Sequence, residues 1–90
     1  MKITLDIERD FVLDLEAFQI FEEITGLNIF EEDTLARLNT KKLSALFYAG
    51  LKAGGCELTK EQTDKLVTAK RMQMVTQAIH DEMDSSSKNA

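Results

Sequence analysis

The chain has 90 residues, of which 43% are hydrophobic and 30% are charged, and its net charge is −5. This composition predicts one globular domain and excludes a disordered chain. No apolar run approaches the roughly 18–20 residues needed to cross a bilayer, and the acidic balance disfavours binding to a phosphate backbone. The first residues lack the apolar core of a signal peptide. We therefore expect a cytoplasmic protein with neither a nucleic acid nor a membrane as its partner.

The N-terminal segment has the period-two pattern of half-buried strands. Apolar and polar residues alternate over residues 3–7, and the alternation resumes at Phe11 and Leu13 after a charged break at 8–10. We interpret this pattern as two short antiparallel strands joined by a tight turn at the break. The turn has no Asn-Gly or Asp-Gly pair, which is the strongest local signal for a hairpin.

From residue 14 the period becomes helical. Asp14 suits the N-cap position, because its carboxylate can accept a hydrogen bond from the first turn. Gly26 can end the helix in the left-handed conformation. The pattern therefore predicts a helix over residues 14–25. Its apolar face comprises Leu13, Ala17, Phe18, Ile20, Phe21 and Ile24.

Residues 28–39 are less regular. Their acidic residues could cap a short helix over 33–38, and a packed loop is an equally good interpretation. A further helix then begins at residue 39 or 40 and ends before Gly54. Glycine costs about 1 kcal/mol relative to alanine inside a helix, so Gly50 indicates a close helix crossing. The predicted buried face comprises Leu43, Leu46, Phe47, Gly50 and Leu51.

The last predicted helix runs from Lys60 to about Met83. Thr59 and Gln62 fit a capping box at its start. About 24 residues would span roughly 36 Å, which exceeds the diameter of about 30 Å expected for a compact domain, so the helix would overhang. Its thin stripe is rich in methionine, which suits an association surface as well as an ordinary core face.

Together these elements predict an α+β, mainly helical fold, with a short N-terminal β-hairpin followed by three to four helices. Residues 1–83 would form a single globular domain. The polar residues 84–90 would form a disordered C-terminal tail.

The side chains that usually carry chemistry have no suitable neighbours in the sequence. His80 is the only histidine and Cys56 the only cysteine, so the spacing of metal ligands is absent. The glycine pair at 54–55 lacks the Gly-Lys-Ser/Thr of a phosphate-binding loop, and the adjacent acids at 22–23 and 31–33 are expected to face solvent. We predict no catalytic, metal-binding or cofactor-binding residue, and therefore no enzyme.

One basic pair has an unusual position. Lys41 and Lys42 lie in the first turn of a predicted helix, where positive charge is slightly unfavourable. A contact with an acidic partner would explain the pair, and a solvated pair is the alternative.

Three segments together resemble a known family. They are Phe21-Glu22-Glu23-Ile24-Thr25-Gly26, Leu46-Phe47-Tyr48-Ala49-Gly50-Leu51 and Leu58-Thr59-Lys60-Glu61-Gln62. In this pattern the chain resembles the small tail assembly chaperones of long-tailed bacteriophages and related gene-transfer particles. The resemblance implies a non-enzymatic protein that binds the long, helical, aggregation-prone tape-measure protein and helps tail-tube subunits gather on it.

The resemblance supplies no site residues, so we predict the partner-binding surface from the apolar helix faces. A helix bound in a groove uses anchors spaced at i, i+3, i+4 and i+7. The residues predicted to bind the client, or a second copy of the chain, are Phe47, Tyr48, Leu66, Met72, Val75, Ile79 and Met83. Two other functions stay open, a structural subunit of the virion (a connector or tail component) and an acidic inhibitor that mimics DNA.

Overall fold

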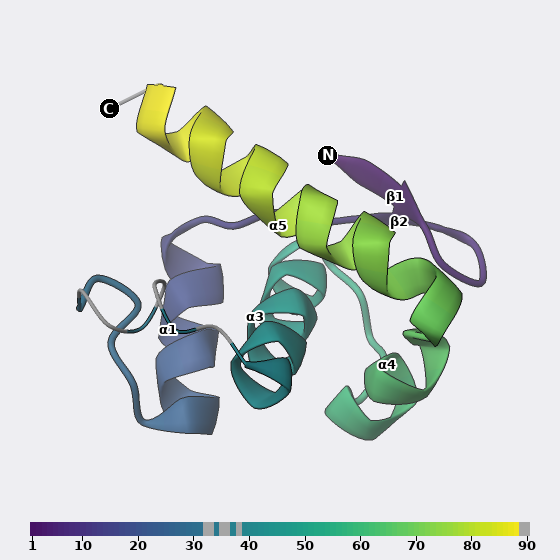
Figure 1. Ribbon diagram of the computed structural model, residues 1–90, viewed down its shortest axis with the longest axis horizontal. Coiled ribbons are helices and arrows are strands. Elements are labelled where there is room, and N and C mark those ends of the chain that lie inside the picture. The colour runs from purple at the N-terminus through teal and green to yellow at the C-terminus, as the bar shows by residue number, and fades with distance from the viewer. Residues whose placement is uncertain (32–33, 35–36, 38, 89–90) are drawn as a thin grey trace.

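In the computed structural model, an N-terminal β-hairpin is followed by four helices in the described part of the chain, which confirms the α+β, mainly helical fold. The description covers residues 1–31, 34, 37 and 39–88, without the side chains of 85–88. The helices are α1 (Leu15–Thr25), α3 (Thr40–Ala53), α4 (Lys60–Leu66) and α5 (Ala69–Lys88). α3 lies centrally, with α1 and α4 on either side and α5 crossing over them (Figure 1). Most of the segment 33–38, predicted as a helix or a loop, lies outside the described residues.

The hairpin pairs β1 (Lys2–Thr4) with β2 (Glu8–Asp10) in antiparallel register, with Ile3 opposite Arg9. The predicted hairpin is therefore present, but the predicted position of its turn is wrong. The charged break at 8–10 is itself the second strand, and the chain turns over residues 5–7. Ile7 consequently lies in the turn with 59% of its surface exposed, although the alternation groups it with buried residues.

The Asp6 carboxylate and the Arg9 guanidinium take the place of the missing turn signal. Arg9 donates from Nε and Nη2 to the two Asp6 oxygens, each at 2.9 Å, and Asp6 Oδ1 also accepts from the Ile7 amide at 2.9 Å. The hydrogen bonds from Arg9 are the main cause that lowers the pKa of Asp6 from 3.8 to about 2. Arg9 Nη1 also reaches Cys56 Sγ at 3.4 Å, so this side chain attaches the hairpin to the loop before α4.

α1 begins and ends as predicted. Asp14 Oδ1 accepts from the Ala17 amide at 3.0 Å, and Gly26 ends the helix with a φ of 71°. The helix contacts α3 and buries Ala17 and Phe21. Ile24, in the last turn, belongs to the predicted apolar face but stays 40% exposed.

α3 supplies the largest share of the core. The Asn39 side chain accepts from the Lys42 amide at 2.9 Å and so caps the helix, which ends before Gly54 as predicted. Leu43, predicted for the buried face, is only partly buried at the edge of the core. The buried residues of α3 are Ala45, Leu46, Phe47, Ala49, Gly50 and Leu51.

Gly50 permits a close approach, but the approaching segment follows the hairpin and is not, as predicted, another helix. A Cβ atom on Gly50 would overlap the fully buried ring of Phe11. The Val12 amide donates to the Gly50 carbonyl at 3.1 Å, and the rings of Phe11 and Phe47 lie 5.3 Å apart between centroids. These contacts hold the end of the hairpin directly against α3.

The prediction of one continuous helix from Lys60 to Met83 is wrong, because α4 and α5 are separate helices. The capping box at the start of α4 is present as predicted. The break falls at Val67 and Thr68, which are β-branched and weak helix formers. A straight helix of roughly 36 Å would also exceed the longest dimension of the molecule, 32 Å. The break allows both α4 and α5 to contact α3.

The junction between α4 and α5 is itself hydrogen-bonded. The Thr68 carbonyl accepts from the amides of Arg71 and Met72 at 2.9 and 3.1 Å, which starts α5. Arg71 Nη1 donates to the Leu66 carbonyl at 2.7 Å and so satisfies a carbonyl group at the end of α4. At its other end α5 continues through Lys88, further than the predicted helix. The division into a domain over 1–83 and a tail over 84–90 stays a prediction.

Gly50→Ala should destabilise the fold. The added methyl group must displace the Phe11 ring, and overpacking of this kind costs about 1–3 kcal/mol, against about 1 kcal/mol gained in helix propensity. Because Phe11 is fully buried, we expect the free energy of unfolding in urea to fall, by up to about 2 kcal/mol. The same change in a Phe11→Leu background should cost less. An equal cost in both backgrounds would show that the ring is not the obstacle.

The hairpin turn should be sensitive to acid. The pKa of Asp6 in the folded chain, about 2, lies below its ordinary value of 3.8. The ionised carboxylate therefore stabilises the fold above about pH 4, and this contribution is lost as the pH falls through about 2. Arg9→Gln should raise the pKa of Asp6 toward 3.8 in an NMR titration, and Arg9→Lys should raise it less. A pKa of about 2 that persists in Arg9→Gln would contradict the assigned cause.

Candidate functional site

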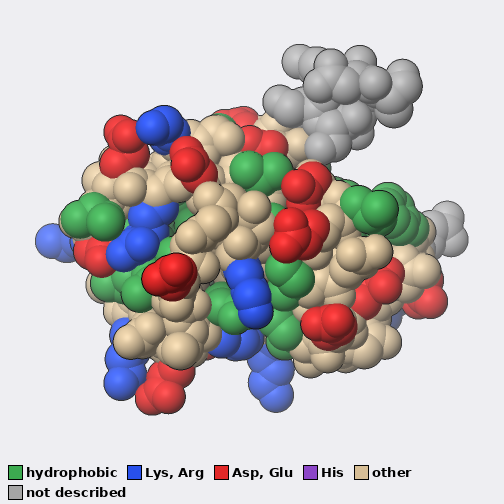
Figure 2. All heavy atoms as spheres, turned by 180° about the vertical axis from the view of Figure 1, so that it is seen from behind, with side chains coloured by type: hydrophobic (Ala, Val, Ile, Leu, Met, Phe, Trp, Pro, Cys, Tyr) green, Lys and Arg blue, Asp and Glu red, His purple; other side chains and the backbone are tan. Residues whose placement is uncertain are grey.

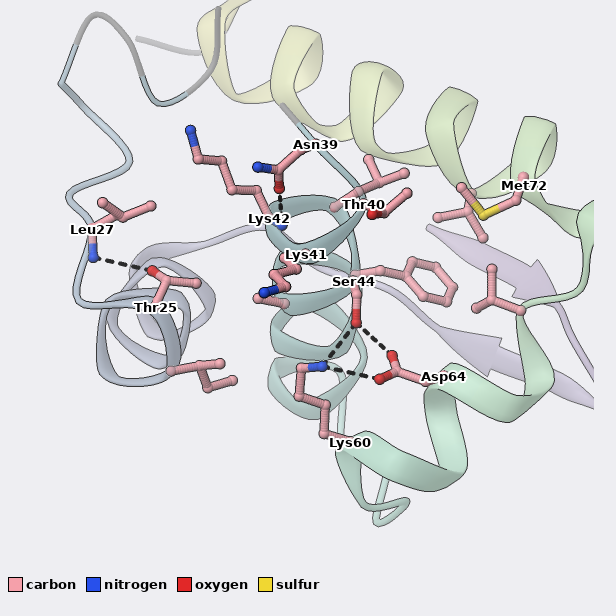
Figure 3. A pocket seen from close by; sticks show the side chains of 16 residues that line it. Thr25, Leu27, Asn39, Thr40, Lys41, Lys42, Ser44, Lys60, Asp64 and Met72 are labelled. Carbon is pink, nitrogen blue, oxygen red and sulfur yellow. Dashed lines mark hydrogen bonds and ion pairs between the residues drawn. The ribbon is translucent and has the colours of Figure 1, made fainter. Parts of the chain in front are cut away.

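A groove opens between the end of α1, the first half of α3 and the junction of α4 with α5 (Figure 3). Its volume is about 740 Å³. Half of the described residues that line it are apolar, namely Ile24, Leu27, Leu43, Ala45, Phe47, Val67, Met72 and Val75. Side chains from three helices therefore converge on one apolar hollow.

The depth of the groove is set by the core beneath it. Phe47 of α3 and Val75 of α5 line the hollow although each is only 1% exposed, so they form its floor. Ile24, in the last turn of α1, and Met72, in the first turn of α5, line it as well and are reached by solvent. A partner that enters the groove would therefore contact these two side chains as well as the floor.

Ser44, Lys60 and Asp64 form a hydrogen-bonded cluster beside the groove (Figure 3). Lys60 Nζ donates to Ser44 Oγ at 2.9 Å and to Asp64 Oδ2 at 3.0 Å, and the Ser44 hydroxyl donates to Asp64 Oδ1. The cluster therefore joins α3 to α4, and an ion pair this exposed contributes about 0–1 kcal/mol.

Two further lysines lie at the mouth of the groove, in the first turn of α3 (Figure 3). Lys42 Nζ donates to the Arg37 carbonyl at 3.0 Å. Neither Lys41 nor Lys42 forms an ion pair with a carboxylate of the described residues. The described lining thus contains three lysines and one aspartate, in a chain whose net charge is −5.

Three of the seven residues predicted to bind a partner, Phe47, Met72 and Val75, meet in this groove. They come from α3 and α5, and the spacing of residues in the sequence does not show that these two helices line the same groove. Because Phe47 and Val75 form the floor, a partner can touch them only from within the hollow.

The other four predicted residues do not line the groove. Ile79 is buried in the core, and Met83 packs against the core while partly exposed. Tyr48 is half-buried, with Lys52 Nζ 5.9 Å from its ring centroid, and Leu66 is half-buried at the end of α4. The structure therefore divides the predicted surface between the groove, the core and separate positions on α3 and α4.

Sequence reasoning missed the apolar sides of the groove, which consist of Ile24, Leu27, Leu43 and Val67. It assigned Ile24 and Leu43 to buried stripes, and it did not single out Leu27 or Val67 for a site. The sequence does contain one indication of the groove, since the apolar stripe predicted for α1 is wider than a single neighbouring helix covers. Ile24 is a member of that stripe which α3 leaves exposed.

Other apolar side chains are exposed outside the groove. Leu15 is 66% exposed and Phe30 is 74% exposed, and the Phe30 ring meets Phe18 edge-on at 5.5 Å. Seen from behind, the molecule shows hydrophobic side chains in separate small areas between charged ones (Figure 2). Single exposed apolar side chains are ordinary on a protein surface. The groove differs because several apolar side chains lie together there, in a concave site.

The described residues offer no other site of recognisable chemistry. They contain no group of three or more His, Cys, Asp or Glu side chains that could hold a metal ion. Cys56 Sγ contacts Arg9, which does not act as a base, and His80 is exposed on α5. In the same part of the chain, no helix is both long and apolar enough to span a bilayer. Comparison with protein-family models, curated proteins and solved structures found no match.

Proposed function

We propose that the chain is a non-enzymatic tail assembly chaperone of the host cytoplasm, and that its groove binds a long helical client of the tape-measure type. The observation that carries the proposal is the apolar groove between α1, α3 and α5. The resemblance of three sequence segments to this family of chaperones supports the same function. Tail-tube subunits would gather on the client while the chaperone covers it.

The shape of the groove suits a helix. An amphipathic helix binds by placing apolar anchors, one or two turns apart, between the helices of its partner. The walls here come from α1, α3 and the segments that follow α1 and α4, and the floor is the aromatic ring of Phe47 together with Val75. Met72 at the side is unbranched and adapts to side chains of different shape, as a client with many successive binding segments requires.

The other two functions make different demands on the surface. A DNA mimic needs carboxylates spaced like phosphates along one face, whereas the lining described for this groove contains three lysines and one aspartate. A virion subunit would form stable rings in solution, which light scattering detects. A chaperone should remain small until its client is present.

Polar substitutions at the sides of the groove should weaken client binding. We predict that Ile24→Gln combined with Met72→Gln lowers the affinity for the tape-measure protein of the same particle roughly tenfold or more, because a buried interface anchor contributes about 1 kcal/mol or more. Both residues are reached by solvent, so the fold should persist by circular dichroism. When the double variant replaces the unaltered chain in co-expression with the client, less of the client should remain in the soluble fraction.

Leu15→Gln is the matched control. It makes the same kind of change on the same helix as Ile24, at a residue that is more exposed and does not line the groove. This control should bind the client like the unaltered chain. Equal loss in control and double variant, or full binding by the double variant, would contradict the assignment of the groove. Absence of any binding by the unaltered chain would contradict the proposed function itself.

A further inference from the structure

The charges at the mouth of the groove indicate what kind of helix fits there. We propose that the groove takes an amphipathic helix whose apolar stripe is flanked by carboxylate side chains, and that these carboxylates lie against Lys41 and Lys42. This inference rests on the proposed function, since it names the chemistry of the client.

The local balance of charge at the groove is positive. Lys60 is paired with Asp64, so among the described lining residues Lys41 and Lys42 carry the uncompensated positive charge. The chain as a whole has 16 acidic and 11 basic residues. An acidic helix is therefore repelled by the net charge of the chain and attracted by the two lysines at the groove, which favours both the site and the orientation of binding.

The position of the two lysines in the fold adds to this positive charge. Both stand in the first turn of α3, which contains no acidic residue. The positive end of the helix dipole adds to their charge instead of compensating it. Lys41 is exposed, and Lys42 is half-buried with its ammonium group held at the Arg37 carbonyl, 3.0 Å away. Carboxylates of a bound helix would relieve the accumulated positive charge.

The lining of the groove favours a helix over a small molecule as the occupant. A volume of about 740 Å³ could also hold a small molecule, whose orientation is normally fixed by polar groups inside the pocket. Here, however, Phe47 and Val75 at the floor have no polar side-chain atom. The floor is apolar and the available charge lies at the mouth. An apolar stripe with carboxylates along its edges matches both parts of the groove.

Two synthetic helices provide the test. Both peptides have about 20 residues and the same leucine stripe, and they differ only in carrying glutamates or lysines beside it. Fluorescence anisotropy should show that the unaltered chain binds the glutamate peptide roughly tenfold more tightly at low salt. The difference should shrink in about 1 M salt, where charges are screened beyond about 3 Å.

Variants of the chain locate the preference. The double variant Lys41→Glu/Lys42→Glu should abolish or reverse the preference for the glutamate peptide. Lys65→Glu with Lys70→Glu changes the net charge equally at exposed residues outside the groove, and should leave the preference in place.

Equal affinity for the two peptides, preference for the lysine peptide, or the same loss in both double variants would overturn the inference. The groove variant Ile24→Gln/Met72→Gln separates the two claims. If this variant binds both peptides more weakly, and the unaltered chain shows no preference between them, the groove binds helices but the client is not acidic. If it weakens neither peptide, the proposed use of the groove fails as well.

Discussion

The contact between Phe11 and Gly50 determines how the rest of the molecule can pack. The Phe11 ring occupies the space that a side chain at position 50 would fill, and the hydrogen bond from Val12 to the Gly50 carbonyl holds the same segment. Phe11 also lies beside Phe47, so the hairpin end closes the core along the second half of α3. The other helices, α1, α4 and α5, also contact α3, and residues in its first half line the groove.

These three helices cover the first half of α3 incompletely, and the groove is the result. α1 ends at Gly26 with Ile24 still exposed. The helical conformation is interrupted at Val67, between the end of α4 and the start of α5. The Ser44–Lys60–Asp64 cluster joins α3 to α4 without filling the hollow. The groove therefore arises from where the neighbouring helices end.

Local signals allowed much of the fold to be predicted, because each acts within a few residues. The Asp14 cap, the left-handed Gly26 and the capping box at Thr59 are such signals. The hairpin turn and the break at 67–68 were missed, because they depend on the Arg9 contact with Asp6 and on the space available beside α3. The groove was found only in part, since its walls come from helices whose relative placement no spacing reveals. Partner binding and the family remain proposals.

The most direct test of the groove as the client site is NMR mapping of backbone amides during titration with soluble segments of the tape-measure protein. If the groove binds the client, the largest shifts should fall on the residues around Ile24, Leu43 and Met72, which line it. The exposed residues Leu15 and Phe30 should change little. Shifts centred on Leu15 and Phe30, with the groove unaffected, would contradict the account.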